Sequence, residues 1–454
     1  MSKRFWIGAA ILLLSTRGFA QTAQDVPILS PPPNIIVPNY NGIPSGPLGG
    51  LEGSAHVARS ADTAAPWFNP AGLSQAGTQL SGSVGNYQFT TVTPKLLPDS
   101  GGGTQHLPSL VGATAKFKGF TVGFSLVTTI AWGTSLDSVF NTTTADGSPR
   151  RFSYSADSGM TQRVSAVAIG RDLGKQFRVG FGVAMTDTSI NSNQVISDRI
   201  ITPKANQTLL FSSRAGGSVQ AARMTIGVQY EPTPMLRFGL VTRSPGIEFG
   251  KSGTISVDST LDGGGPSIGA TLYDAAAQFE FKMPYELAGG AAVVGKRAEI
   301  EFDVKTYASV PSYALLSTGQ SFSIYRDPGT GSGATVETRP FPAIMTEFQT
   351  VTNYTSGGHI RVLDSPLPLT LHGGIGTDHS PIRSSDTGVF GQVDFRVLTA
   401  GISGSISKFT FAFGVNSRNG SMDNLVLRNL IIGPVPASLQ IHTIGITYAL
   451  NYKF

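Results

Sequence analysis

The chain has 454 residues, of which 33 are Lys or Arg, 28 are Asp or Glu, 55 are Gly and none is Cys. Without cysteine it cannot be a disulfide scaffold, a thiolate zinc protein or an enzyme with a cysteine nucleophile. Only 13% of the residues are charged and 40% are hydrophobic, which argues against a wholly disordered chain. Glycine is nearly twice as frequent as its ordinary share of roughly 7%. Together with short apolar alternations, this abundance indicates an all-β protein.

The first twenty residues have the features of a signal peptide. Lys3 and Arg4 precede an apolar stretch at 5–14, and Gly18 and Ala20 are the small residues that a signal peptidase requires. Ten apolar residues are too few for a membrane-spanning helix, which needs about 20. Removal of this segment leaves 30 basic and 28 acidic residues, so the charge gives no reason to expect a nucleic-acid partner.

Two segments of different character follow the signal peptide. Residues 21–49 are rich in proline, which predicts an extended arm in the periplasm. Residues 50–78 consist mainly of small and apolar side chains in a compact, helix-and-turn pattern without alternation. A segment of this kind before a barrel either hangs in the periplasm or folds into the barrel and plugs it.

From about residue 79 onward the chain alternates between two unlike faces, which is typical of β-strands. In the segment 177–185, every odd position is large and apolar, whereas the even positions are Gly, Ala or Arg. The segments 409–416 and 299–305 follow the same rule, the latter with charges of both signs opposite the apolar side chains. This pattern suits a membrane barrel that is apolar outside and small or polar inside. The sheet must close, because unpaired backbone groups would be unsatisfied in hydrocarbon.

The alternating segments number fourteen, and their connections are short and long in turn, as expected for short periplasmic turns and long external loops. The predicted strands lie near 80–90, 109–118, 120–131, 160–170, 176–187, 220–230, 236–245, 270–294, 297–308, 355–364, 368–377, 394–404, 408–417 and 439–454. The predicted long loops are 91–108, 132–159, 188–219, 246–269, 309–354, 378–393 and 418–438.

One proline decides the strand count. Lys282-Met283-Pro284 could be a turn that divides 270–294 into two strands, but that would place two short connections in succession and give an odd number. We therefore predict a single long strand in which Pro284 removes one ladder hydrogen bond and produces a kink or bulge.

The C-terminus indicates where the barrel resides. Phe454 and Tyr452 share one face of the last strand with further large apolar residues, and small or polar residues occupy the other face. A terminal Phe on such a strand resembles the assembly signal of bacterial outer-membrane barrels. We therefore expect the bacterial outer membrane as the location, and outer-membrane lipid, lipopolysaccharide and the barrel assembly machinery as partners.

Several motifs, spread from about residue 50 to the end, carry a more specific resemblance. They are Asp62-Thr63-Ala64, Phe68-Asn69-Pro70-Ala71-Gly72-Leu73, the run 227–234 with 237–240 and 242–244, Met283-Pro284-Tyr285-Glu286-Leu287, and 371–376 with 378–381. These motifs resemble the outer-membrane transporters of long-chain fatty acids and hydrophobic compounds, the FadL/TodX type. The proline-rich arm is longer than that family leads us to expect, and no Pro-Asp-Asp-Arg run follows residue 381.

The resemblance implies a fourteen-stranded antiparallel transmembrane barrel whose N-terminal hatch, at 50–78, plugs the interior. It implies passive uptake of fatty acids or similar hydrophobic compounds by a monomer, with hatch movement, lateral release through the wall, and no cofactor or metal. By this resemblance, Asn69, Pro70, Ala71 and Gly72 form the hatch motif.

Three arginines on the predicted inner faces are candidates for contact with a ligand. Arg178, Arg237 and Arg243 could each form a charge-assisted hydrogen bond with a carboxylate. The alternative is that they pair with acidic residues inside the barrel, namely Glu299, Glu301 and Asp303.

Three other functions remain open at this stage. A non-specific porin lacks an N-terminal plug, so residues 50–78 argue against one, whereas a surface or adhesin barrel would differ only in its failure to take up a ligand. A lipase-like barrel enzyme is the less favoured alternative, and the six histidines show no metal-ligand spacing. The sequence therefore favours a transporter over an enzyme, and it leaves the substrate undetermined.

Overall fold

The computed structural model describes most of the chain beyond the proline-rich arm. The described residues are 35, 37–41, 44, 46–94, 101–107, 109–143, 147–201, 206–263, 267–329, 333–364, 367–382, 393–429 and 433–454. The predicted signal peptide lies outside them. None of the helices in this part of the chain has the length and apolar character that crossing a membrane requires.

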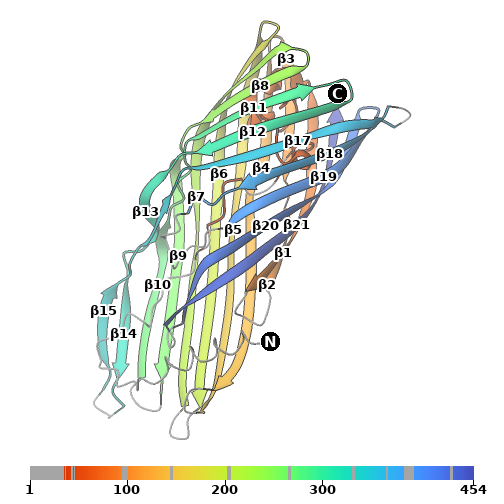
Figure 1. Ribbon diagram of the computed structural model, residues 1–454. Coiled ribbons are helices and arrows are strands. Elements are labelled where there is room, and N and C mark those ends of the chain that lie inside the picture. Colours follow the sequence, from red (N-terminus) through yellow and green to blue (C-terminus); the bar gives the residue numbers. More distant parts are fainter. Residues whose placement is uncertain are drawn as a thin grey trace, which may run out of the picture.

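A closed ring of fourteen antiparallel strands forms the molecule, as predicted (Figure 1). In ring order the strands are β1 (Gln79–Pro94), β3 (Leu110–Phe117), β4 (Phe120–Thr143), β5 (Pro149–Leu173), β6 (Phe177–Ile201), β7 (Asn206–Thr233), β8 (Leu236–Arg243), β11 (Glu286–Val294), β12 (Ala298–Tyr307), β17 (Val351–Leu363), β18 (Leu369–Asp378), β19 (Asp394–Ile406), β20 (Phe409–Asn429) and β21 (Gly433–Lys453). The ring closes where β21 pairs with β1 from Gln79 opposite Lys453 onward.

Further strands continue the wall away from the short turns. They are β2 (Gly101–Leu107), β9 (Ile247–Asp262), β10 (Ser267–Phe279), β13 (Val310–Ser317), β14 (Ser321–Asp327), β15 (Thr335–Pro340) and β16 (Ile344–Phe348). Of these, β9 pairs with β7 and β10, β10 with β13, and β13 with β16, whereas β14 and β15 form a hairpin at the edge of β10.

Much of what the sequence indicated as long external loops is strand instead. The segment 132–159 contains the end of β4 and the start of β5, and 188–219 contains the end of β6 and the start of β7. The prediction was wrong because it followed large apolar residues on the outer face, and the strands continue beyond the point where those residues stop.

The polarity of the outer and inner faces changes part-way along the long strands, as β6 shows. Its outer face is apolar from Phe177 to Met185 and polar from Asp187 to Asn191. Its inner face is small or polar from Arg178 to Thr188, and then carries the buried side chains of Ile190 and Ile196. The outer apolar belt suits hydrocarbon. Beyond the belt, the outer face of β6 is more polar and its inner face carries more apolar side chains than within the belt.

Pro284 lies in a break between two strands, β10 and β11, where the sequence predicted one long strand with a kink. The break at 280–285 separates β10 from β11, and it faces the break at 244–246 between β8 and β9. Arg223 of β7 bridges the two breaks by donating to the carbonyl oxygens of Ser244 at 2.9 Å and Pro284 at 2.8 Å.

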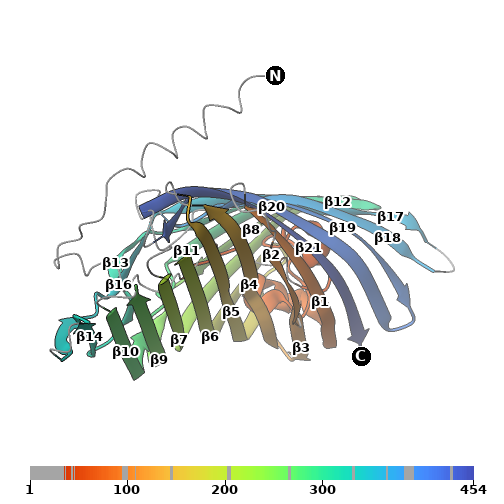
Figure 2. The same cartoon turned by 90° about the horizontal axis from the view of Figure 1, so that it is seen from below.

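A run of short helices lies inside the ring of strands (Figure 2). It consists of η2 (Gly49–Glu52), α2 (Ala65–Phe68), η3 (Pro70–Gly72) and α3 (Leu73–Ala76). We call residues 49–76 the interior segment. Its η2 contacts β17 to β20, whereas η3 contacts β5 to β7, so the segment reaches opposite sides of the ring.

The described part of the proline-rich arm also lies inside the wall, not in the extended periplasmic position that its composition indicated. Ile35, Val37 and Tyr40 are buried in an apolar cluster with the inner faces of the long strands. Proline content indicated an extended backbone, but it carried no information about the apolar surface on which the intervening side chains pack.

At the other end of the chain, Phe454 follows the last strand. Its backbone N–H donates to the carbonyl of Thr78 at 3.2 Å, and its exposed ring contacts that of Tyr452 edge-on at 4.8 Å. The role of these two residues as an assembly signal stays a prediction.

Candidate functional site

The predicted hatch motif packs directly on the inner wall. The Asn69 side chain donates to the carbonyl oxygens of Val57 at 2.9 Å and Val228 at 3.1 Å, and its Oδ1 accepts the N–H of Ala71 at 3.1 Å. Asn69 therefore connects two parts of the interior segment to β7 and also caps η3, which begins at Pro70.

Glycines in the wall make this close approach possible. Gly180 of β6 and Gly227 of β7 are direct ladder partners beneath η3. A Cβ atom on Gly180 would overlap the backbone of Pro70, and one on Gly227 would overlap the side chain of Asn69. Part of the unusual glycine content thus provides space for the interior segment.

The opposite wall is built in the same way under η2. Gly357 of β17 and Gly374 of β18 are ladder partners, and a Cβ atom on either would overlap the backbone of Glu52. The hydroxyl of Thr399 donates to the carbonyl of Leu51 at 2.8 Å. The interior segment is thus held between two glycine patches on opposite sides of the ring.

A buried ionic network adds to these contacts. Arg59 of the interior segment, 4% exposed, lies 2.5 Å from Glu52, 2.8 Å from Glu301 and 3.5 Å from Glu299. Burial disfavours the charged form of Arg59, but the charges of Glu52 and Glu301 outweigh it and raise the pKa of Arg59 above its usual value. Asp303 accepts the backbone N–H of His56 at 2.8 Å. Three acids that the sequence offered as partners of the wall arginines therefore hold the interior segment instead.

Arg243 is the one of the three candidate arginines that lines an interior cavity. It bonds to Glu286 and to the backbone carbonyl of Trp67, and it donates to that of Phe68 at 3.1 Å. Its guanidinium lies 4.5 Å from the centre of the Trp67 ring. The cavity, which Lys305 also lines, has a volume of about 50 Å³, too small for a fatty acid.

Arg178 and Arg237 lie elsewhere, beside the short turns. Arg178 bonds to Glu231 and lies 3.6 Å from Asp172, and Arg237 lies 3.7 Å from Glu231. Neither lines the cavity at Arg243. Whether any of the three arginines contacts a ligand stays a prediction.

A large apolar interior occupies the end of the barrel away from the short turns, and sequence analysis did not find it. We call this cluster the apolar chamber. Its walls come from the extended parts of several strands, for example Ile190, Phe211, Ile255, Leu272 and Phe279. The arm residues Ile35, Val37 and Tyr40 lie within it. The signal that could have revealed the chamber is the exchange of apolar residues from odd to even positions along strands such as β6.

The arm is attached where it enters the chamber. Asn39 donates to the carbonyl oxygens of Asp378 at 2.6 Å and Val393 at 2.8 Å, and the ring of Tyr40 packs at 4.7 Å on that of Tyr307.

The ladder between β3 and β4 is short. Their ladder ends at Leu110 opposite Val127, and the next described pair on that side of β4 joins Gly102 to Ser135. The stretch of β4 between those pairs includes Ile130, a buried member of the apolar chamber. β2 lies alongside this stretch of β4, but the described residues give the two strands a single ladder pair.

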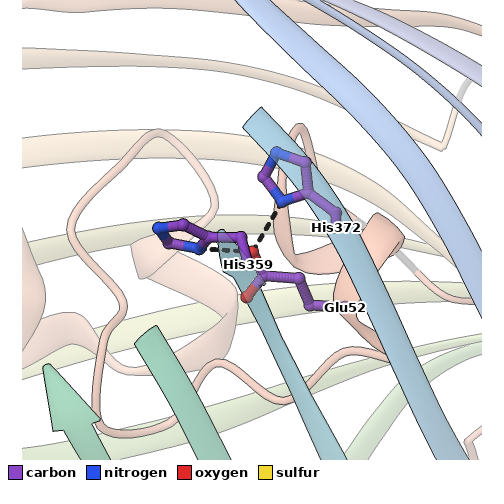
Figure 3. Close-up of side chains that lie close together, drawn as sticks. All are labelled: Glu52, His359 and His372. Atoms are coloured by element: carbon purple, nitrogen blue, oxygen red, sulfur yellow. Dashed lines mark hydrogen bonds and ion pairs between the residues drawn. The ribbon is translucent and has the colours of Figure 1, made fainter. Parts of the chain in front are cut away.

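Two histidines and a glutamate also come together, although the sequence showed no metal-ligand spacing. His359 of β17 and His372 of β18 are direct ladder partners, and their Nδ1 atoms lie 2.8 and 2.7 Å from Oε1 of Glu52 (Figure 3). Strand register, not linear spacing, creates this group.

The fold is that of known channels. No family model and no curated protein matches the chain. Among solved structures, it resembles a FadL homologue of Pseudomonas aeruginosa, with TM-score 0.59 and 13% identity over 93% of this chain and 100% of that one. The Ralstonia pickettii toluene transporter TbuX gives TM-score 0.55 and 14% identity, and the monoaromatic hydrocarbon channel CymD gives 0.53 and 14%; each comparison covers 92% of this chain and 99% of the other. The chain has their fold.

These similarities agree with the predicted architecture and with an outer-membrane barrel. The neighbours are transporters or channels rather than enzymes. At 13 to 14% identity the comparison shows the fold and does not identify a substrate for this chain.

Proposed function

We propose that the protein takes up hydrophobic compounds, such as long-chain fatty acids or aromatic hydrocarbons, across the bacterial outer membrane by passive diffusion. The observation that carries this proposal is the apolar chamber. It fills the barrel interior beyond the outer apolar belt. An ordinary water-filled porin has a polar interior instead. The titles of the similar structures, a toluene transporter and a hydrocarbon channel, point to the same class of compound.

Passage requires movement of the interior segment and the arm. The arm fills part of the chamber, the interior segment lies between the two glycine patches, and the cavity at Arg243 has a volume of only about 50 Å³. A fatty acid must therefore displace parts of the chain, as lid and loop movements do in other proteins. The interior segment acts as a hatch in this proposal.

Release is lateral, through the wall beside the chamber. The stretch of β4 with a single ladder pair to β2 is a place where the wall can open without the loss of a continuous ladder. A lateral exit keeps the apolar ligand out of water, which avoids the cost of exposing it, about 25 cal/mol for each Å².

The test is an uptake assay in cells that lack their own hydrophobic-compound transporter. We expect the wild type to restore uptake of a labelled fatty acid or of toluene. We expect Asn69→Ala, which removes the bonds to Val57, Val228 and Ala71, and deletion of 50–75 to change that uptake. Unchanged uptake in both variants would refute the hatch role.

A single-channel recording separates this function from that of a porin. The wild type should show no large open pore, whereas deletion of 50–75 should produce one. A large steady conductance in the wild type would favour the porin.

A further inference from the structure

We propose that Glu52, His359 and His372 form a binding site for a divalent transition metal, with Zn²⁺ as the best-fitting ion, that fastens the interior segment to the barrel wall. The site is independent of which compound the protein transports.

The first argument is the convergence of three donor atoms from three elements. Glu52 ends η2, and the two histidines lie opposite each other on β17 and β18 with ring centres 5.3 Å apart. One donor atom from each residue lies within 4.8 Å of the other two. Two imidazoles and a carboxylate are the protein ligands of many zinc sites, which leave a fourth position to water.

In the absence of metal, the same atoms form hydrogen bonds, with both Nδ1 atoms directed at the same oxygen of Glu52. Metal binding needs only a change of tautomer: each neutral imidazole moves its proton from Nδ1 to Nε2 and offers the freed Nδ1 lone pair to the ion. A small outward shift of the rings then makes room for the ion, because Zn–N and Zn–O distances of about 2.0–2.2 Å separate adjacent ligands by more than a hydrogen bond does.

The outer contacts are those that hold metal ligands in place. Nε2 of His372 lies 2.8 Å from the hydroxyl of Ser403, and Oε2 of Glu52 lies 2.5 Å from Arg59. Metal-bound histidines almost always use their second ring nitrogen in this way, which fixes the orientation of the ring.

The local charge also favours a cation. Arg59 faces three carboxylates, those of Glu52, Glu299 and Glu301.

An ion can reach the group. The His359 side chain is 24% exposed, whereas that of Glu52 is 2% exposed. Glu299, His359 and His372 also line an open depression in the wall. Because two of the donors are imidazole nitrogens, the site should select Zn²⁺ or Co²⁺ over Mg²⁺ or Ca²⁺, which prefer oxygen ligands.

The test is calorimetric titration of ZnCl₂ into the tag-free, EDTA-treated full-length mature protein in detergent. We expect one Zn²⁺ per chain and no binding heat with Mg²⁺. His359→Gln and His372→Gln should abolish binding, and Ser403→Ala should weaken it by about 10- to 100-fold. His442→Gln is the matched control, because His442 is an exposed histidine on β21 outside the group, and it should bind as the wild type does.

A second measurement distinguishes a loss of metal binding from a folding defect in the variants. In the wild type, Zn²⁺ should slow tryptic cleavage after Arg59. His359→Gln protein should show no such protection. Its gel mobility before and after heating should confirm that its barrel is folded. Absence of Zn²⁺ binding by the wild type, or equal binding by both histidine variants and the wild type, would overturn the proposal. Neither outcome affects the uptake assay, so the two proposals fail separately.

Discussion

Gly374 lies directly under Glu52, so close that a single methyl group on the glycine would overlap the carbonyl carbon of the glutamate. The neighbouring Gly373 points to the other side of the wall, where a Cβ atom would have the carbonyl oxygen of Thr399 at 3.8 Å as its nearest neighbour. The inner surface of the wall at this point is thus shaped for the interior segment.

We predict that Gly374→Ala loosens the interior segment without disrupting the barrel. The added methyl group must displace the backbone of Glu52, and overpacking of this kind costs about 1–3 kcal/mol. Trypsin should then cleave after Arg59, which is buried in the wild type, at a higher rate. Gly373→Ala is the matched control and should leave the cleavage rate unchanged. Equal cleavage rates in the two variants would show that the segment does not rest on Gly374.

Removal of the buried arginine should be costly. In Arg59→Met, Glu52 and Glu301 lose their shared cationic partner while they stay buried, which costs about 3–5 kcal/mol. The free energy of unfolding, measured by urea titration in lipid vesicles, should fall by that amount. The control is Arg297→Met, because Arg297 forms an exposed pair with Asp364 that contributes about 0–1 kcal/mol. A loss in Arg59→Met no larger than that in Arg297→Met would contradict the network.

Acid should weaken the attachment of the interior segment. Burial opposes ionisation of Glu52 and Asp62, but their histidine partners and other hydrogen bonds outweigh it and lower both pKa values from 4.5 and 3.8. A group whose pKa is lowered on folding contributes full stability above its unfolded pKa and loses it as the pH falls toward its folded value. Attachment should therefore weaken as the pH falls below about 4.5.

Trp67, which lies in the interior segment, provides the readout for this effect. In a Trp132→Phe background its fluorescence should change on acidification below about pH 4.5 before the barrel itself unfolds. Glu52→Gln removes one of the two carboxyls and should reduce the pH dependence. If the fluorescence changes only together with barrel unfolding, the carboxyls do not control the attachment.

The sequence predicted the wall better than the interior. Period-two alternation and the interpretation of Pro284 as a kink gave fourteen strands, because both depend on local backbone chemistry. The strand ends were wrong because the outer face of β6 becomes polar at Asp187 while the strand continues to Ile201. The sequence could have revealed this, since Ile190 and Ile196 begin a second alternation of opposite phase.

The contacts of the interior segment could not be predicted from linear spacing. His359 and His372 meet because of strand register, and Glu52 reaches them from a segment some three hundred residues away in sequence. The same holds for Arg59 with Glu301. The hatch motif at Asn69 was identified by resemblance, whereas its partners Val57 and Val228 emerged only from the fold.

The central claim is that the apolar chamber carries the ligand, and Phe211 and Leu210 test it most directly. Phe211 is 1% exposed within the chamber, whereas its neighbour Leu210 is 52% exposed on the outer face of the same strand. The measurement is the initial rate of toluene or fatty-acid uptake by cells with equal amounts of folded barrel in the outer membrane. We predict that wild type and Leu210→Ser take up the compound alike and that Phe211→Ser is slower. Equal rates in all three, or a wild-type rate no higher than that of cells without the protein, would contradict the account.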